Sequence, residues 1–488
     1  AKWRACYAGA GTGHAVLYAV DSEVVRLGVT VHDRTEAVAL IHDGGRCWGA
    51  VARCLRTGEH TAILAKATVI TTGGHGRIYG QYTTNATINE GMGAVIALDT
   101  GIVPLGNMEA VQFHPTALSP SGILVTEGCR GDGGYLLDKD GYRFMVDAEP
   151  EKQELASRDV VSRHMAQRMR DGFGVETKHG PHLWLDVRHL GDEHLRTKLR
   201  EVWEICRDFV GLDPAEELVP VRPTQHYSMG GVRVNAEGEA YNMAGLFAVG
   251  EASCWDMHGF NRLGGNSLAE TIVSGRLVGR RIAQTIGRGG VEAETRYANE
   301  ALQKAEERAA ELLARQGDGP GPYAVRDAMA EVMIGKVGIF RTGEELEQAV
   351  ADLGRLLQDC DRIVLRSKAP GMNPELSFAL RIKNMVRLAY ITAKGALERT
   401  ESRGAHFRSD FPLRDDASWL NRTLARWPDS AAAPELSYEP VGELDVPPGH
   451  RGYGADERIE MELTVEDYNR QVEEAQRAAG KLPTEGVL

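Results

Sequence analysis

The stretch QFHPTALSPSGILVTEGCRGDGG, residues 112–134, decides how the rest of this 488-residue chain is interpreted. Its polar members are His114, Thr126, Glu127 and Arg130, and the glycines at its end free the backbone for close approach to a ligand. An ordinary polar loop explains any one of these residues alone, because scattered polar residues are mostly solvated surface. Their combination within one short stretch favours a binding site.

The same residue types recur in three later segments, which read LASRDVVSR at 155–163, PTQHYSMGG at 223–231 and GFNRLGGNSLAE at 259–270. Together the four segments resemble the flavoprotein subunit of the succinate dehydrogenase and fumarate reductase family, and the match runs in order from about residue 4 to residue 420. The resemblance implies an α/β FAD-binding domain, an inserted α+β capping domain and a C-terminal helical domain, with FAD as the cofactor.

On this resemblance the FAD-binding domain occupies 1–107 and 222–288, the capping domain 108–221, the helical domain 289–425 and a tail 426–488. GAGTGH near the N-terminus is not a dinucleotide-binding turn, because His14 replaces the third glycine of the fingerprint. The family's first strand, its glycine turn and the histidine that bonds to the flavin in many relatives are not found in the sequence. We therefore expect an incomplete FAD-binding domain, with its first Rossmann unit missing.

The net charge, the lengths of the apolar runs and the spacing of the cysteines argue against several classes of function. The formal net charge of −13 argues against nucleic acid as a main partner. No stretch approaches the roughly 20 apolar residues that a membrane-spanning helix needs. The seven cysteines form no Cys-x-x-Cys pair, so neither a zinc site nor an iron–sulfur cluster is indicated, and electrons would have to leave to another chain.

Hydrophobic periodicity predicts the main elements. Strands are expected at 29–38, 49–55, 67–72 and 246–249. Helices are expected from about residue 92 and at 268–286, 291–316, 323–337, 343–358, 374–398 and 465–478, the last with Thr464 as its N-cap. The four helices between 291 and 398 predict an antiparallel helical domain joined by short loops.

The resemblance implies a four-carbon dicarboxylate substrate, fumarate or succinate, which needs both its ends held. The planar fork of an arginine suits one carboxylate, and Arg262, supported by His226, is the candidate. His114 and Thr126 suit the other end, with Glu127 close by. These four residues, His114, Thr126, His226 and Arg262, are the predicted substrate-binding set.

Reduction of a C=C bond beside a carboxylate needs a hydride and a proton, and the flavin must carry the hydride because no side chain can. In the family an arginine is taken as the acid, and Arg158 occupies that position. Because a guanidinium stays charged up to a pKa above about 12, it needs a carboxylate to reload it, and Glu127 is the candidate. His114 and Arg130 complete the predicted catalytic set. The alternative role for Arg158 is an ion pair with Asp159 or another acid.

The predicted flavin contacts come from four parts of the chain. A buried strand runs into Gly73 and Gly74, Glu90 stands where relatives usually carry an aspartate, and Glu251 suits a ribityl hydroxyl. Backbone N–H groups of Ser267 and Leu268 at a helix start suit the polar edge of the flavin ring. Arg262 completes this set, and the backbone of 264–267 is a candidate for stabilising charge on the substrate.

The resemblance therefore predicts the flavoprotein subunit of a quinone-linked enzyme that interconverts fumarate and succinate, with VRPT before His226 and NSLAE leaning toward fumarate reductases. The implied partners are an iron–sulfur subunit and membrane anchor subunits, which would hold the chain peripherally on the cytoplasmic face of the inner membrane. Two alternatives stay open: an L-aspartate oxidase-like flavoenzyme, and a flavin-free, non-catalytic fragment. TEGCR at 126–130 and RDD at 414–416 favour the dicarboxylate branch over the oxidase.

Overall fold

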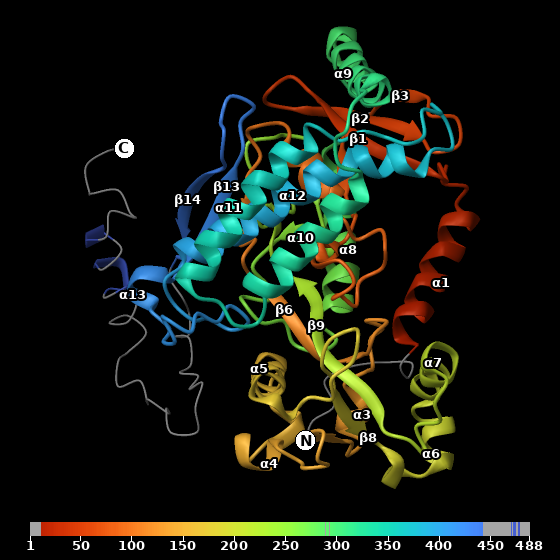
Figure 1. The fold of residues 1–488 in the computed structure, drawn as a ribbon. Helices are drawn as coiled ribbons and strands as arrows, with labels where there is room; N and C mark the ends of the chain where they lie inside the picture. The colour runs from red at the N-terminus through yellow and green to blue at the C-terminus, as the bar shows by residue number, and fades with distance from the viewer. Residues whose placement is uncertain are drawn as a thin grey trace.

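The computed structural model describes residues 11–287, 289–291, 293–442, 470, 472–474 and 477–478. Figure 1 shows an upper body, which holds the long helices, and a lower body joined to it by β6 (Val111–Leu118) and β9 (Val219–Ser228). Thr464 and most of the helix predicted at 465–478 lie outside the described residues.

The strands form four sheets among the described residues. An antiparallel meander contains β1 (Thr35–His42), β2 (Cys47–Cys54) and β3 (His60–Leu64), and a parallel pair contains β4 (Thr68–Ile70) and β11 (Leu246–Ala248). A five-stranded sheet has the order β12 (Ser253–Cys254), β10 (Gly231–Arg233), β5 (Leu105–Gly106), β13 (Asn421–Arg426) and β14 (Glu435–Pro440). The fourth has the order β6, β9, β8 (Leu183–Asp186) and β7 (Tyr135–Leu137).

The strand predicted at 29–38 is wrong in its first half. The helix α1 (Thr12–Arg26) is followed by Gly28 at φ 65°, and a turn at residues 33–34, with Arg34 at φ 50°, delays β1 to Thr35. Valines favour a strand in this window, but the turn residues prevail over that preference. The strands predicted at 49–55, 67–72 and 246–249 are confirmed as β2, β4 and β11.

The predicted long helices are confirmed with small shifts at their ends. They are α8 (Asn266–Thr285), α9 (Thr295–Ala314), α10 (Pro322–Lys336), α11 (Gly343–Cys360) and α12 (Pro374–Glu398), and the shorter α2 (Met92–Leu98) begins where it is expected. Side-chain caps fix two of the starts: Thr342 accepts from the Glu345 N–H, and Asn373 accepts from the Leu376 N–H. α12 is buried over most of its circumference, as befits a central helix.

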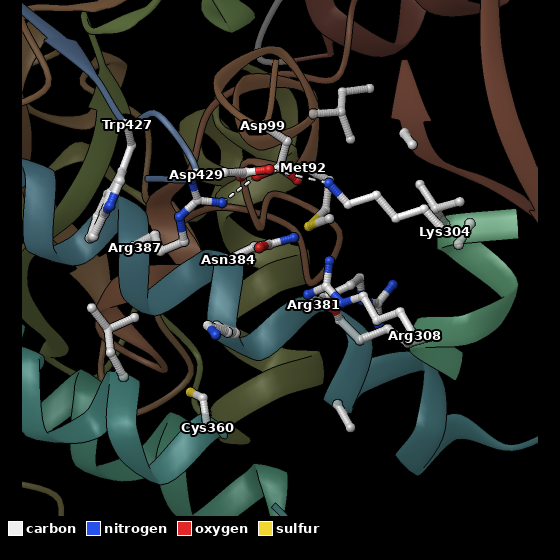
Figure 2. A pocket seen from close by; sticks show the side chains of 18 of the residues that line it. Met92, Asp99, Lys304, Arg308, Cys360, Arg381, Asn384, Arg387, Trp427 and Asp429 are labelled. Atoms are coloured by element: carbon white, nitrogen blue, oxygen red, sulfur yellow. Dashed lines mark hydrogen bonds and ion pairs between the residues drawn. The ribbon is translucent and has the colours of Figure 1, made fainter. Parts of the chain in front are cut away.

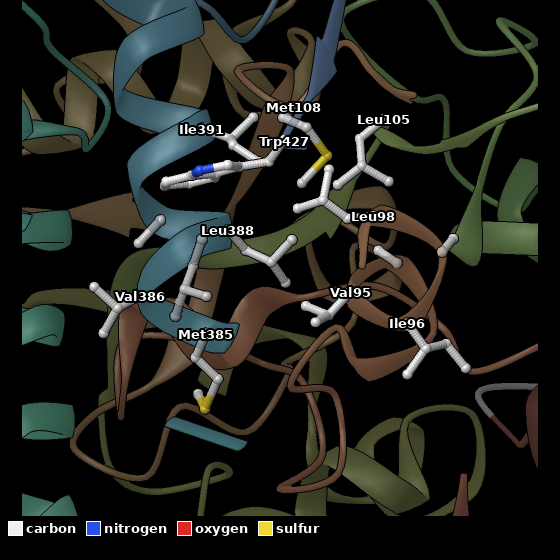
Figure 3. Packing of buried hydrophobic residues seen from close by; sticks show 14 of the residues in the cluster. Val95, Ile96, Leu98, Leu105, Met108, Met385, Val386, Leu388, Ile391 and Trp427 are labelled. Carbon is white, nitrogen blue, oxygen red and sulfur yellow. The ribbon is translucent and has the colours of Figure 1, made fainter. Parts of the chain in front are cut away.

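The main core lies between α2, α12 and the strands near them. Figure 3 shows Leu98 of α2 facing Leu388 of α12, with Met108 and Trp427 closing the same cluster. This packing joins the helical part of the chain to the part that carries the parallel pair.

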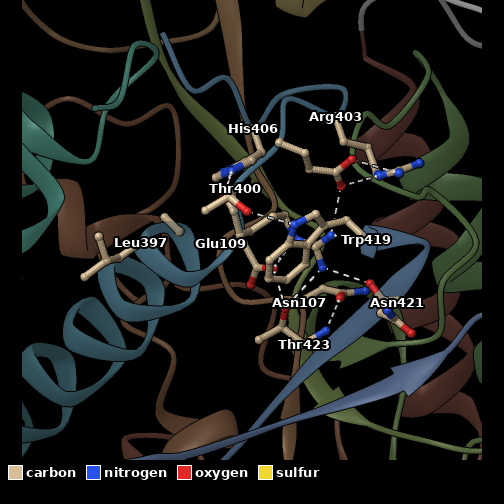
Figure 4. Close-up of polar contacts among 12 residues, drawn as sticks. Asn107, Glu109, Leu397, Thr400, Arg403, His406, Trp419, Asn421 and Thr423 are labelled. Atoms are coloured by element: carbon tan, nitrogen blue, oxygen red, sulfur yellow. Dashed lines mark hydrogen bonds and ion pairs between the residues drawn. The ribbon is translucent and has the colours of Figure 1, made fainter. Parts of the chain in front are cut away.

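A buried polar network links the end of α12 to Glu109 and to β13 (Figure 4). Arg399, directly after α12, is fully buried and donates to Glu109 at 2.9 Å, to Glu401 at 3.0 Å and to Thr423 of β13 at 3.1 Å. A buried arginine is tolerated when its donors are met in this way. The strand at 421–426 that Arg399 contacts pairs with β5 in the sheet that contains β10, which sequence periodicity did not predict.

The lower body mixes short helices with strands, as predicted for 108–221. Its helices are α3 (Gly128–Gly131), α4 (Met145–Ala148), α5 (Arg158–Arg168), α6 (Asp192–Thr197) and α7 (Arg200–Val210). It has a hydrophobic cluster of its own, which includes Leu136, Val161 and Leu185. The strands β6 and β9 run from this body into the upper one, so residues at their junction can meet groups from both.

Candidate active site

The histidines predicted from distant segments lie side by side on β6 and β9. The ring centroids of His114 and His226 are 4.9 Å apart. The Thr116 N–H donates to Nδ1 of His114 at 3.2 Å, so a neutral His114 carries its proton on Nε2. Nδ1 of His226 lies 2.7 Å from the hydroxyl of Thr84, which fixes the orientation of that ring.

Both imidazoles are held neutral. Burial, together with His226 and Arg158 nearby, lowers the pKa of His114 well below its ordinary value. Burial and then Arg262 and Arg158 lower the pKa of His226 in the same way. At neutral pH these side chains therefore act as hydrogen-bond donors or acceptors without adding positive charge.

Arg158 is the first residue of α5 and points at Glu127. Its Nε donates to Glu127 Oε2 at 2.8 Å, and its Nη2 lies 2.7 Å from the same oxygen. Asp159, the other acid considered for Arg158, instead forms ion pairs and hydrogen bonds with Arg163 and Asn261. The acid that pairs with Arg158 is thus the one predicted as its proton partner.

Gln112 links Arg262 to the same cluster. The Gln112 amide donates to the Arg262 carbonyl at 2.7 Å, while its oxygen accepts from Arg158 Nη1 at 3.5 Å. The Arg262 guanidinium lies 4.6 Å from the ring centroid of Tyr227, and its buried Nε has no partner among the described residues. This Nε is therefore available to a ligand, whereas Nη1 donates to the Leu263 carbonyl at 3.3 Å. Gln112 opens the stretch that decides the fold, but no motif argument had assigned it a role.

Arg130 and Thr126 flank this cluster. Arg130 donates through Nη1 to the Glu154 carbonyl, and within the described part of the chain its buried Nε and Nη2 have no partner. The hydroxyl of Thr126 accepts from the Gly128 N–H at 3.2 Å. Both lie in the segment that carries Glu127, as their spacing predicts.

The cluster is electropositive. Burial raises the pKa of Glu127, but Arg158 and Arg130 outweigh that effect and bring it below the ordinary value, so Glu127 is ionised. Burial lowers the pKa of Arg262 to about 10, and Arg158 adds to the lowering, yet Arg262 still carries its charge at neutral pH. Arg158, Arg130 and Arg262 lie around the ionised Glu127, and Glu251 is a further carboxylate that acts on Arg262. The positive charge of the three guanidinium groups suits a dianionic ligand.

The comparisons with known proteins agree on one family. A model described as an FAD binding domain matches residues 1–268, and one described as the fumarate reductase flavoprotein C-terminal domain matches 326–453. The fumarate reductase flavoprotein subunit of Helicobacter pylori (strain J99) is 46% identical over 483 residues, covering 93% of this chain and 67% of that protein. The chain belongs to the fumarate reductase and succinate dehydrogenase flavoprotein family. It is an FAD-dependent oxidoreductase, and FAD is its cofactor.

Two further relatives support this membership. The succinate dehydrogenase flavoprotein subunit of Coxiella burnetii is 35% identical over 458 residues, covering 92% of this chain and 77% of that protein. A structure of the Escherichia coli quinol fumarate reductase carrying a variant flavoprotein subunit superposes with a TM-score of 0.86 at 36% identity, over 92% of this chain and 78% of that one. The α/β FAD-binding domain with capping and helical domains is the architecture that this membership implies.

The residues predicted to hold FAD include a cradle that fits it. Gly73 has φ 71°, and a Cβ on Gly74 would lie 2.5 Å from the Glu251 carboxylate, so both positions require glycine. Gly265 starts α8 without a side-chain cap, and the N–H groups of Ser267 and Leu268 have no backbone partner among the described residues. These unpaired donors suit the electron-rich edge of a flavin.

Glu90 forms an ion pair with an arginine of the helical part of the chain. Its carboxylate lies 2.9 Å from Arg381 Nε, and it lines a cavity of about 1780 Å³ between β1, α2, α9, α11 and α12. Figure 2 shows Arg381 and Asn384 in this cavity. α12 therefore supplies the counter-ion of Glu90, while Asn89 beside it lies against Gly73, where a Cβ would come 2.6 Å from the Asn89 amide. The role of Glu90 as a flavin contact stays a prediction.

Glu251 makes stability depend on pH. Burial raises its pKa to about 7, so the folded protein binds this proton more tightly than the unfolded chain. Stability should therefore fall as pH rises from about 4.5 to 7, by up to about 3 kcal/mol, and stay at the lower level above. In Glu251→Gln this fall should disappear. Urea unfolding of the flavin-free protein and the variant at pH 5 and pH 8 measures it, and equal pH dependence in both would contradict the assignment.

Proposed function

We propose that this chain is the flavoprotein subunit of a quinone-linked enzyme that interconverts fumarate and succinate. The observation that supports this most is the convergence of the Arg158–Glu127 pair, Arg262 and two neutral histidines on one place, next to the bare start of α8. A dicarboxylate is the ligand whose two charges match that arrangement.

In this proposal Arg262 and His226 hold one carboxylate of the substrate, while His114 and Thr126 hold the other. Arg262 offers donors that the described residues leave without partners, including the buried Nε. His114 offers its Nε2 proton, because Nδ1 is occupied by the Thr116 N–H. Held at both ends, the substrate has one orientation, which contributes much of the rate acceleration.

Bound FAD supplies or accepts the hydride. Arg158 delivers the proton to the neighbouring carbon in fumarate reduction and takes it back in succinate oxidation. In fumarate reduction Glu127 Oε2, 2.7 Å from Arg158 Nη2, takes a proton from solvent and passes it to the neutral guanidine. Arg158 and Arg130 keep the pKa of Glu127 low, so it gives up that proton readily and is ionised again. Fumarate, one hydride and one proton then balance as succinate.

The test is an assay in both directions on the flavin-loaded protein, produced with its iron–sulfur partner. We expect succinate from fumarate with a reduced viologen dye, and fumarate from succinate with an oxidised dye. Absence of both activities in a yellow, flavin-replete preparation would contradict the proposal. Release of ammonia from L-aspartate would favour the oxidase alternative.

The proposed partners are an iron–sulfur subunit and, through it, membrane anchor subunits with a quinone. In the described part of the chain no helix has the length and apolar character to cross a membrane. Peripheral attachment to the cytoplasmic face of the inner membrane through these partners is the arrangement that we propose.

We further propose that a first Rossmann unit completes the FAD-binding domain. Among the described residues β4 pairs only with β11, which leaves its other edge open. α1 buries no residue, and α8 buries only Glu270, Ser274 and Val278 over its full length. A strand and a helix packed against these surfaces would cover them, as parallel sheets are ordinarily covered.

A further inference from the structure

Behind the substrate cluster lies a buried group that the proposed mechanism does not use. Glu270, one turn into α8, accepts a hydrogen bond from the Tyr227 hydroxyl at 2.7 Å. Nε2 of His258 lies 2.9 Å from the same Oε2 atom. Glu270 is 4% exposed and Tyr227 is also 4% exposed, so this is an interior contact and not a surface pair.

The three residues come from three segments that surround Arg262. Tyr227 follows His226 on β9, His258 lies in the loop between β12 and α8, and Glu270 lies on α8 itself. Arg262 is carried by the second half of that same loop. The Glu270 carboxylate therefore fastens the loop and β9 to the helix, on either side of the arginine.

Arg262 depends on this arrangement because few other groups hold its side chain. Its guanidinium rests on the Tyr227 ring at 4.6 Å, and its one hydrogen bond within the described part of the chain goes to the Leu263 carbonyl, at 3.3 Å. Among the described residues no carboxylate forms an ion pair with it within 4.0 Å. A cation over an aromatic face is oriented by that face, so the position of the ring sets the position of the fork.

We infer that Glu270 is a positioning residue for Arg262, acting through the Tyr227 ring and the His258 loop, and that it thereby sets how well the site holds a dicarboxylate. The inference rests on the proposed function for the identity of the substrate. The hydrogen-bond partners of the Glu270 carboxylate are Tyr227 and His258, neither of which is assigned to the substrate or to FAD.

The first test compares Glu270→Ala, Glu270→Gln and Tyr227→Phe in the flavin-loaded protein. Loss of the carboxylate should raise KM for fumarate about tenfold and leave kcat within about threefold, because Arg262 binds substrate and transition state alike. Glu270→Gln keeps an acceptor oxygen, so its KM should lie within about threefold of the KM of the unaltered protein. Tyr227→Phe keeps the ring and should raise KM by about threefold. The control is Thr197→Val at the exposed end of α6, which should change neither constant.

A double-mutant cycle separates positioning from a merely structural role. Once Arg262→Gln has removed the fork, adding Glu270→Ala should cost less than about twofold more. Independent, multiplying losses would overturn the inference, since they would mean that Glu270 acts on the fold at large. A KM unchanged in Glu270→Ala would overturn it as well.

Binding of malonate, followed by the change in the flavin spectrum, keeps this inference distinct from the proposed function. If the protein binds malonate but converts neither fumarate nor succinate, the proposed function fails, and a tenfold weaker Kd in Glu270→Ala still supports the role of Glu270. If that variant binds malonate as tightly as the unaltered protein, the inference fails whatever the turnover. No malonate binding by the unaltered protein contradicts both.

Discussion

Replacement of Arg158 by glutamine is expected to lower turnover in both directions by about 10²–10⁴-fold, the range ordinarily contributed by a positioned proton donor. Malonate binding and FAD content should stay within about threefold, because the substrate ends are assigned to other side chains. The loss follows from geometry: of the three arginines in the cluster, Arg158 is the one that forms an ion pair with a carboxylate among the described residues, with Glu127 at 2.7 Å. Steady-state assays with fumarate and with succinate measure it.

A matched control is Arg188→Gln, which removes an exposed arginine paired with Asp186 in the same part of the chain. It should leave both activities unchanged. Glu127→Gln should slow turnover less than the loss of Arg158, since water can reload the guanidine slowly. An Arg158→Gln enzyme that keeps a tenth or more of its kcat would show that the proton comes from another group.

The second large effect is expected from Arg262→Gln. Two charge-assisted hydrogen bonds to a carboxylate are together worth about 3–6 kcal/mol, so kcat/KM for fumarate should fall by about 10²–10⁴-fold. The loss should be far smaller for crotonate, because we assign its single carboxylate to the end held by His114 and Thr126, so that its methyl group faces Arg262. Comparing the two substrates with the reduced dye separates the lost carboxylate contact from general damage.

Arg207→Gln, an exposed change on α7, is the control for Arg262. It should affect neither substrate. Equal losses for fumarate and crotonate in Arg262→Gln would contradict the assignment of Arg262 to one carboxylate. Arg262→Lys should recover only part of the activity, because an ammonium ion lacks the planar fork.

Much of the helical architecture could be predicted from sequence, since caps and periodicity are local. Asn373 and Thr342 mark the starts of α12 and α11 where a capping residue is expected. The convergence of His114, His226, Arg158 and Arg262 could be anticipated only through the family resemblance, because their separation along the chain hides their proximity. Their assigned roles stay predictions.

Sequence patterns do not predict which strands and side chains from distant parts of the chain contact one another. Nothing local says that Thr423 pairs with Glu109 or that 421–426 form a strand beside β5. Glu90 keeps the charge that the family uses, yet only the packing of α12 reveals that Arg381 takes up that charge. Glu270 stands inside a motif quoted for other reasons, and its hydrogen bonds to β9 and to the His258 loop become visible only in three dimensions.

The most direct measurement of the central claim is a single turnover. The flavin-loaded protein is reduced anaerobically, mixed with fumarate, and the flavin absorbance and the succinate formed are followed together. Convergence of the arginines and histidines on a dicarboxylate site beside FAD predicts rapid reoxidation with one succinate per flavin, and slow reoxidation by crotonate. A flavin that stays reduced in the presence of fumarate would contradict the account.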